Sequence, residues 1–189
     1  VGFGKTEVAI RAAFKAVDNN KQVVILVPTT ILALQHYKTF TSRLKEFPIS
    51  IDYLNRFRSS KEKSDIIYNL SNGKIDIIIG THQIINKKIK YKDIGLLIID
   101  EEHRFGVKHK EKIRQLRFGV DVLSLSATPI PRTLQQSMLG IRDISIINTP
   151  PITRKPIETH VEYFSWDRCY EIIKNEVLRG GQVYFLHNR

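Results

Sequence analysis

The sequence predicts an α/β protein built on a doubly wound, mainly parallel β-sheet. Six or seven short apolar runs alternate with segments of helical periodicity along the first 148 residues. Runs such as residues 23–27 and 96–99 are apolar at every position, which is typical of strands buried on both faces of a parallel sheet. Four of the runs end in polar residues, and open α/β sheets bind ligands at the carboxyl ends of their strands.

Composition and charge are those of a globular protein that suits a polyanionic partner. The 189 residues are 42% hydrophobic and 26% charged, with a formal net charge of +11. This excess favours a polyanionic partner through counterion release and is compatible with nucleic acid, although lysine and isoleucine are used heavily throughout. The apolar runs are too short to span a bilayer. Cys169 is the only cysteine, which excludes an internal disulfide and indicates a reducing compartment.

The first residues form part of a phosphate-binding motif. Its members are Gly2, Phe3, Gly4, Lys5 and Thr6, and a segment of helical periodicity follows at once. Backbone N–H groups at a helix start face an anion, and glycines let the backbone approach it closely. We expect Lys5 to reach the β- and γ-phosphates of a nucleotide and the Thr6 hydroxyl to bind Mg²⁺. The alternative is a glycine-rich turn with an exposed lysine.

The full G-x-x-x-x-G-K-[ST] pattern needs a glycine before Val1, and the chain has no initiator Met. We therefore expect this sequence to be a segment of a longer protein, with room upstream for a targeting peptide.

The first three predicted strands, residues 23–27, 49–54 and 75–79, each lead into polar or basic residues. Pro28 stops the first strand, and the helix after it keeps a 4-3-4-3 apolar spacing. The candidate residues after the three strands are Thr29, Thr30, Arg56, Arg58, Thr81 and His82. Thr30 suits a helix cap, and the two arginines either hold phosphates or lie in an ordinary solvated loop.

The fourth predicted strand carries the residues around which the chain is organised. Residues 96–99 are apolar and lead into Asp100, two glutamates and His103. Carboxylates gathered at one strand end repel each other unless a cation lies among them, and Mg²⁺ is commonly held by one or two carboxylates and substrate phosphates. Together with the glycine-rich motif, this strand end predicts a magnesium–nucleotide site shared by Lys5 and Asp100. The alternative is an acidic surface loop.

Two further strands are predicted in this lobe, at residues 122–125 and 144–147. Ser126 and Thr128 follow the first of them, and a helix is expected over residues 131–140 because Pro131 suits a first turn and Gly140 an end. The four polar strand ends are expected to line one edge of the sheet.

Three prolines in eight residues mark residues 149–156 as a linker. Beyond it, strands are expected at residues 157–164 and 183–186 with a helix between them. About thirty residues cannot close a core of their own. We therefore divide the chain into a nucleotide-binding lobe over residues 1–148, the linker, and the beginning of a second lobe over residues 157–189.

The motifs GFGKT, PTT, GTH, DEEH and SAT, in this order and spacing, resemble the first RecA-like lobe of superfamily 2 helicases and translocases. The longer signatures HRFGV and SATPIPRTL resemble two families within that group, the bacterial transcription-repair coupling factors and the branch-migration helicases of the RecG type. The DEEH, PTT, RFRS and RDISIINTPP segments are similar to the coupling factors. This resemblance implies a RecA-like P-loop NTPase fold followed by the start of a second RecA-like lobe.

The resemblance also implies roles for individual residues. The phosphates and Mg²⁺ would be held by the glycine-rich motif, Asp100 would position Mg²⁺ through water, and Glu101 would orient and deprotonate the attacking water. The residues that would transmit the nucleotide state are His103, Arg104, Ser126 and Thr128. The residues that would contact one tracked strand of duplex DNA are Thr29, Thr30, Thr81 and His82.

The activity implied by the resemblance is ATP-driven translocation on double-stranded DNA in the bacterial cytoplasm, with ATP and Mg²⁺ as cofactors. In the coupling-factor family this motion displaces stalled RNA polymerase and recruits an excision-repair damage-recognition protein, through regions outside this segment. A RecG-type branch-migration helicase is the alternative, and a catalytically inactive nucleic-acid-binding remnant is an alternative of another class. Because the family's arginine fingers lie in the second lobe, we expect the segment alone to bind DNA weakly and hydrolyse ATP negligibly.

Overall fold

The structure is a computed structural model that describes residues 2–86, 89–106, 109, 111–113, 119–127, 143–151 and 157–187. The chain divides into two compact units, residues 1–152 and residues 153–189, and each is described by itself. The predicted division into a first lobe, a linker and the beginning of a second lobe stays a prediction.

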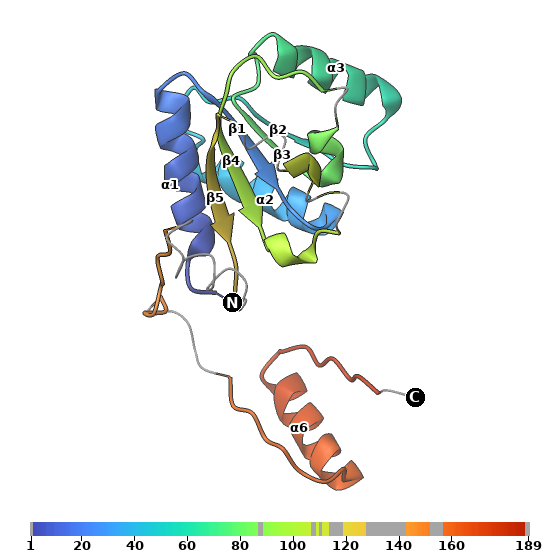
Figure 1. Ribbon diagram of the computed structural model, residues 1–189. Coiled ribbons are helices and arrows are strands. Elements are labelled where there is room, and N and C mark those ends of the chain that lie inside the picture. The colour runs from blue at the N-terminus through green and yellow to red at the C-terminus, as the bar shows by residue number, and fades with distance from the viewer. Residues whose placement is uncertain are drawn as a thin grey trace. The chain divides into compact units, whose positions relative to one another are not determined.

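The first unit contains a five-stranded, fully parallel sheet with the strand order β2-β3-β1-β4-β5 (Figure 1). The strands are β1 (Gln22–Leu26), β2 (Ile51–Leu54), β3 (Ile77–Gly80), β4 (Ile94–Asp100) and β5 (Asp121–Leu125). From β1 the chain passes to β2 at one edge of the sheet, returns to β3 beside β1, and then crosses to β4 and β5 on the other side of β1. This topology confirms the predicted doubly wound α/β fold.

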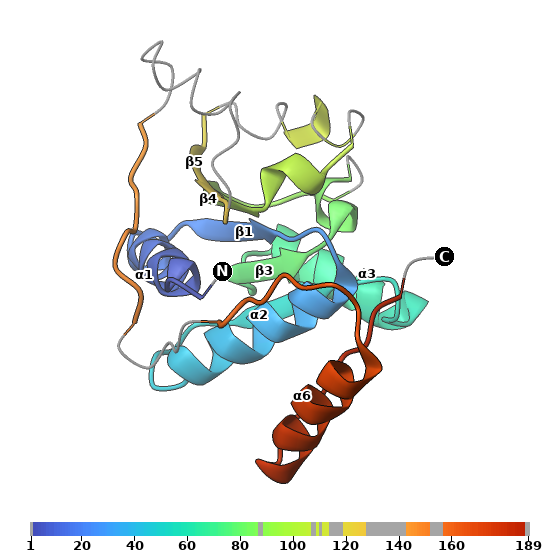
Figure 2. The same cartoon turned by 90° about the horizontal axis from the view of Figure 1, so that it is seen from below.

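Helices cover both faces of the sheet. On one face lie α1 (Lys5–Asp18) and α2 (Thr30–Arg43), and the other face is covered by α3 (Ser60–Ser71) and the short helix η1 (His82–Ile85) (Figure 2). Alternate residues of β1 divide between two hydrophobic clusters, with Ile25 facing α1 and α2 and Val24 facing α3. A strand with helices on both faces must be apolar at every position, which explains the continuous apolar runs in the sequence.

The helix ends follow local rules. The side chain of Ser59 caps α3 in a reciprocal capping box with Glu62. In the second unit, α6 (Trp166–Leu178) lies in the interval where the sequence predicts a helix, with the Ser165 side chain accepting the N–H of Arg168. No helix in the described ranges combines the length and the apolar character needed to cross a membrane.

Three predicted strands are absent from the structure. Residues 144–147, 157–164 and 183–186 are all described, and none of them forms a strand. Their side chains are largely exposed, for example Ile146 at 73% and Val161 at 95%. A strand persists only where a neighbouring strand takes its backbone hydrogen bonds, and no described residue pairs with these segments. The strand predictions there are wrong because apolar composition alone supplies no such partner.

Other predictions fall outside the described residues. These are the helix over residues 131–140, Thr128, and most of the linker.

Candidate active site

The polar strand ends meet at one edge of the sheet, as the sequence predicts. The strands are parallel, and Leu26 of β1 lies in register with Gly80 on one side and with Ile99 on the other. Asp100 at the end of β4 is in register with Leu125 at the end of β5. Figure 1 shows the start of α1 at this same edge, beside the arrowheads of β4 and β5.

The glycine-rich motif leads into α1 with a backbone suited to holding an anion. Gly2 and Gly4 have φ angles of 80° and 82°, in the left-handed region that glycine adopts without strain. Gly4 is the N-cap and brings no side chain to the first-turn N–H groups. A Cβ built on Gly4 meets no atom within 4 Å, so the space in front of the helix end is open. The positive end of the helix dipole faces that space.

One ion pair joins the glycine-rich motif to the acidic strand end. Nζ of Lys5, the first residue of α1, lies 3.0 Å from Oε1 of Glu101, a residue 96 positions away in sequence. Both side chains are largely buried, with 23% and 15% of their surfaces exposed. Charge-assisted hydrogen bonds of this length are among the stronger ones in proteins. The two motifs that the sequence predicts to share a site are therefore in direct contact.

Glu101 collects several further contacts at this edge. Oε1 accepts the backbone N–H of Ala127 at 3.1 Å, and the Ser126 hydroxyl lies 3.5 Å from Oε2. Nδ1 of His103 is 3.4 Å from the same Oε2. Glu101 thus touches the lysine of the phosphate motif and the segment after β5 at the same time.

The backbone of Glu101 is also unusual. Its φ of 51° and ψ of 55° place a non-glycine residue in the left-handed region, at a cost of roughly 1–2 kcal/mol. Its N–H still donates to the carbonyl of Leu125, which extends the β4–β5 ladder by one bond. Such strain persists where surrounding contacts hold it, and it is concentrated at functional sites.

Asp100 has a different partner. Oδ2 of this carboxylate lies 3.3 Å from Nε2 of His36, which comes from α2. Both side chains are buried, with 13% of the Asp100 side chain and 9% of the His36 side chain exposed. His36 is not among the residues predicted from the sequence, although a polar residue between Ala33 and Phe40 on the apolar face of a helix is a signal for a buried contact.

The threonines after β1 are placed by helix capping. Thr29, and not Thr30, is the N-cap of α2, and its Oγ1 accepts the N–H of Leu32 at 3.2 Å. Thr30 is the first residue of the helix. The prediction that Thr30 caps this helix is therefore wrong by one position, because the extended backbone of Thr29 is what brings a side-chain oxygen over the first turn.

The residues after β3 lie at the same edge. Thr81 is buried and precedes η1, and its carbonyl accepts the N–H of Ile84. The ring of His82 stacks on the ring of His109 with centroids 4.6 Å apart. Burial lowers the pKa of His109, and the neighbouring His82 and Lys112 lower it further.

Arg58 is engaged by acidic side chains of the protein. Its guanidinium pairs with Asp52 at 2.9 Å and Glu62 at 2.8 Å and lies 4.2 Å from the centre of the Tyr53 ring. The Arg58 hydrogen bond, followed by those from Ser59, lowers the pKa of Glu62 to about 2. These contacts brace the turn between β2 and α3.

Arg56 lies over the ring of Phe57 in the same turn. The turn follows β2, which is separated from β4 by β3 and β1. Arg104 ends the short helix η2 (Glu102–Arg104) directly after the acidic strand end. The structure thus brings together Lys5, Glu101, His103 and Ser126, with Asp100 adjacent, and leaves the two arginines of the β2–α3 turn in a separate group.

The donors at this edge fit a magnesium–nucleotide complex. Mg²⁺ needs one or two carboxylates when phosphate oxygens and water complete its shell, and Asp100 together with the hydroxyl of Thr6, in the first turn of α1, would supply such a set. Among the described residues no group of three or more His, Cys, Asp or Glu is arranged to hold a metal by itself. A magnesium site whose remaining ligands are phosphate oxygens and water does not require such a group of protein ligands.

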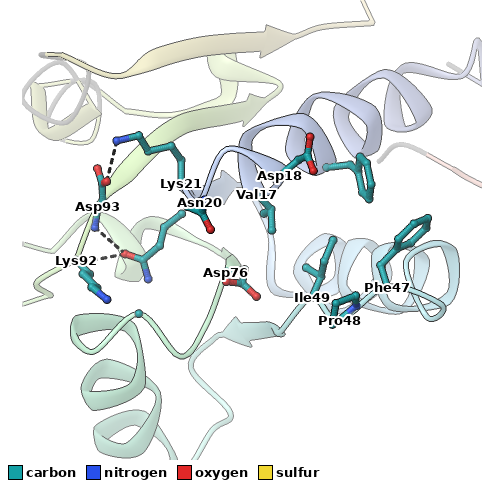
Figure 3. Close-up of a pocket in the computed structure, with 13 residues that line it drawn as sticks. Val17, Asp18, Asn20, Lys21, Phe47, Pro48, Ile49, Asp76, Lys92 and Asp93 are labelled. Atoms are coloured by element: carbon teal, nitrogen blue, oxygen red, sulfur yellow. Dashed lines mark hydrogen bonds and ion pairs between the residues drawn. The ribbon is translucent and has the colours of Figure 1, made fainter.

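The opposite edge of the sheet has a pocket of about 470 Å³ (Figure 3). It lies among the end of α1, the turn after α2 and the starts of the strands, and Figure 3 shows Lys21 directed at Asp93 beside it. The buried side chain of Gln22 donates to the carbonyls of Leu70 and Ile75. The amides of residues 92 and 93 donate to its Oε1. These hydrogen bonds join the start of β1 to the segments before β3 and β4. They lie at the opposite end of the strands from Asp100 and Glu101.

Comparison with known proteins gives a consistent result. The model of the DEAD/DEAH box helicase family matches residues 1–137. The whole chain is 60% identical to the transcription-repair-coupling factor of Bacillus subtilis (strain 168) and 57% identical to that of Escherichia coli (strain K12). It spans 16% of the length of either relative.

Among solved structures, RecG bound to a three-way DNA junction is similar with a TM-score of 0.77 and 38% identity, over 95% of this chain and 24% of that one. The DUF1998 helicase MrfA bound to DNA is similar in fold alone, with a TM-score of 0.58 and 13% identity over 71% of this chain and 20% of that one.

Proposed function

Because this chain belongs to the DEAD/DEAH box helicase family, we propose that it is the ATP-binding lobe of an ATP-driven translocase on double-stranded DNA. The similarity to transcription-repair-coupling factors over the whole chain confirms the resemblance predicted from the motifs. It favours a translocase that displaces stalled RNA polymerase and promotes excision repair in the bacterial cytoplasm. Contacts with the polymerase and with the damage-recognition protein are assigned to regions outside this chain.

The Lys5–Glu101 contact is the observation that carries this proposal. It joins a phosphate-binding turn to a carboxylate that can act as a general base, which is what nucleotide hydrolysis requires. The N–H groups at the start of α1 and the Lys5 ammonium are assigned to the phosphates. Thr6 and Asp100 would hold Mg²⁺, which would supply positive charge to offset the negative charge of the phosphates.

The contacts of Glu101 indicate how the base is switched on. While Lys5 pairs with Oε1, this oxygen is engaged by the ammonium group and does not act as a base toward water. Once Lys5 has phosphate oxygens as partners, Oε1 is free to accept a proton from water, and the Ala127 amide still orients the group. His103 and Ser126 contact the other oxygen of Glu101 and connect it to the segment after β5.

Nucleic-acid contacts are assigned to the loops at the ends of β1 and β3, through Thr29, Thr30, Thr81 and His82. Arg56 and Arg58 remain candidates for phosphate contacts, although two carboxylates already hold Arg58. Coupling to stepping is assigned to Arg104 together with the SAT segment, whose Thr128 lies outside the described residues. Since the family's arginine fingers belong to a second lobe, the 189-residue segment alone is assigned negligible turnover.

Site-directed variants of the full-length protein test this function. Glu101→Gln keeps the shape of the side chain and removes the base, so DNA-stimulated ATP hydrolysis should fall by about 10²–10⁴-fold while ATP stays bound. Lys5→Ala should lose ATP binding itself. Glu102→Gln is the matched control, because the neighbouring Glu102 is also a carboxylate and accepts a hydrogen bond from the Ser124 hydroxyl. Unchanged turnover in Glu101→Gln would refute the assignment of the base.

The alternatives differ in measurable ways. Release of a stalled RNA polymerase by the full-length protein is expected of a coupling factor, whereas branch migration without release would favour the RecG-type alternative. DNA binding without any ATP turnover in the unmodified protein would favour the inactive remnant.

A further inference from the structure

His36 is a polar residue in the apolar face of α2. The buried residues of this helix are Ala33, His36 and Phe40, and the His36 ring is tilted against Phe40 with centroids 6.3 Å apart. Moving an imidazole from water into such surroundings is unfavourable unless a hydrogen bond compensates for the lost hydration. The location of its partner is therefore informative.

That partner is Asp100. A carboxylate only accepts, so in the 3.3 Å contact Nε2 of His36 is the donor and Oδ2 of Asp100 the acceptor. The other ring nitrogen, Nδ1, is buried and has no hydrogen-bond partner in the described part of the chain. Among the described residues, the second oxygen of Asp100, Oδ1, accepts no hydrogen bond. His36 is thus committed to one oxygen of this carboxylate and leaves the other available.

The two acids at the end of β4 are held differently. Glu101 has Lys5, His103 and the segment after β5 around it, so it keeps partners when one is lost. The hydrogen bond to Asp100 comes from His36 alone among the described residues. The orientation of Asp100 therefore depends on a single donor from another helix.

We infer that His36 is a positioning residue for the magnesium site. By donating to Oδ2 it holds the Asp100 carboxylate in one orientation, with Oδ1 directed to Mg²⁺ or to a water bound to it. The inference rests on the proposed function, since it gives a purpose to Asp100 as a magnesium-binding group. Partners of this kind, which orient a metal-binding side chain, typically affect metal affinity by about 10–100-fold when they are removed.

Three variants of the full-length protein separate positioning from packing. His36→Leu keeps an apolar side chain of similar size and removes the donor. His36→Gln places an amide N–H close to the position of Nε2, whereas His36→Asn is polar and one bond too short to reach Asp100. Phe40→Leu is the matched control, because it disturbs the packing beside the His36 ring and keeps the Nε2 donor.

The direct readout is the affinity for Mn²⁺, measured by electron paramagnetic resonance in the presence of a non-hydrolysable ATP analogue. Affinity for the analogue itself is measured in parallel with EDTA present. His36→Leu and His36→Asn should weaken Mn²⁺ binding by about 10–100-fold and leave metal-free nucleotide binding unchanged, and His36→Gln should stay within about threefold of the parent. Phe40→Leu should lower thermal stability without changing Mn²⁺ affinity.

Several results would overturn the inference. Mn²⁺ affinity in His36→Asn equal to that of the parent would show that the orientation of Asp100 does not depend on this donor. A parallel loss of metal-free nucleotide binding would show a general packing effect. If His36→Leu fails to fold, the comparison of His36→Gln with His36→Asn still decides the question. Absence of metal-dependent nucleotide binding in the unmodified protein would instead refute the proposed function, and this inference with it.

Discussion

Replacing Gln22 by alanine tests how the sheet that carries the acidic strand end is held together. The Gln22 side chain makes four hydrogen bonds, of 2.8 to 3.1 Å, to backbone groups of four residues outside its own strand. At about 0.5–1.5 kcal/mol each, these bonds are together worth roughly 2–6 kcal/mol. The adjacent pocket admits water, which can replace part of them, so we expect a loss of about 3 kcal/mol.

Hydrogen exchange measured by mass spectrometry in the full-length protein gives the local effect. A loss of about 3 kcal/mol corresponds to roughly 100-fold faster exchange in peptides covering β1 and the start of β4, where opening breaks these bonds. Lys21→Ala is the matched control, because it removes an exposed ion pair to Asp93 between the same two segments. Such pairs contribute less than about 1 kcal/mol, so exchange should rise by less than about fivefold.

The reasoning is refuted if Gln22→Ala exchanges no faster than Lys21→Ala. That result would mean that water from the pocket satisfies all four backbone groups, and that the buried amide contributes nothing to stability.

Two further predictions concern residues near the carboxyl ends of β3 and β1. Because burial, His82 and Lys112 all lower the pKa of His109, the unfolded chain binds this proton more readily, and the fold loses stability as the pH falls below the ordinary histidine value near 6.5. Histidine NMR should show His109 titrating below that value, and His82→Ala should raise its pKa; a pKa at or above 6.5 in the parent would contradict this. Thr29→Ala should destabilise α2 by about 1 kcal/mol through loss of the cap on the Leu32 amide, whereas Thr29→Ser should not, as measured by exchange of the first turn. Equal exchange in Thr29→Ala and the parent would show that the cap contributes nothing.

Much of the fold could be predicted from the sequence because its signals are local. The apolar runs that became β1, β3 and β4 are continuous, and only a strand covered on both faces requires that pattern. The glycine-rich turn and the start of α1 follow from the same local logic, since a phosphate cradle needs left-handed glycines at the helix end. The exposed apolar segments at residues 144–147 and 157–164 carried a similar local signal and still formed no strand.

Individual contacts within the site were less predictable. The sequence places Asp100 and Glu101 together, but it does not show that Lys5 meets the second acid and His36 the first. From the sequence, Arg58 is interpreted as a cation in a basic turn that either holds phosphates or is solvated. In the structure it forms ion pairs with Asp52 and Glu62. These pairings depend on side-chain directions that no periodicity encodes.

By itself, the sequence determined the parallel α/β sheet, the phosphate-binding turn and the edge at which the polar strand ends gather. Burial on two faces and the backbone freedom of glycine are properties of neighbouring residues, and they leave a pattern in the chain. Only the tertiary structure decided the partners of the two acids. Lys5 and Glu101 are 96 positions apart and His36 and Asp100 are 64 apart, so which atoms meet depends on how α1 and α2 pack against β4.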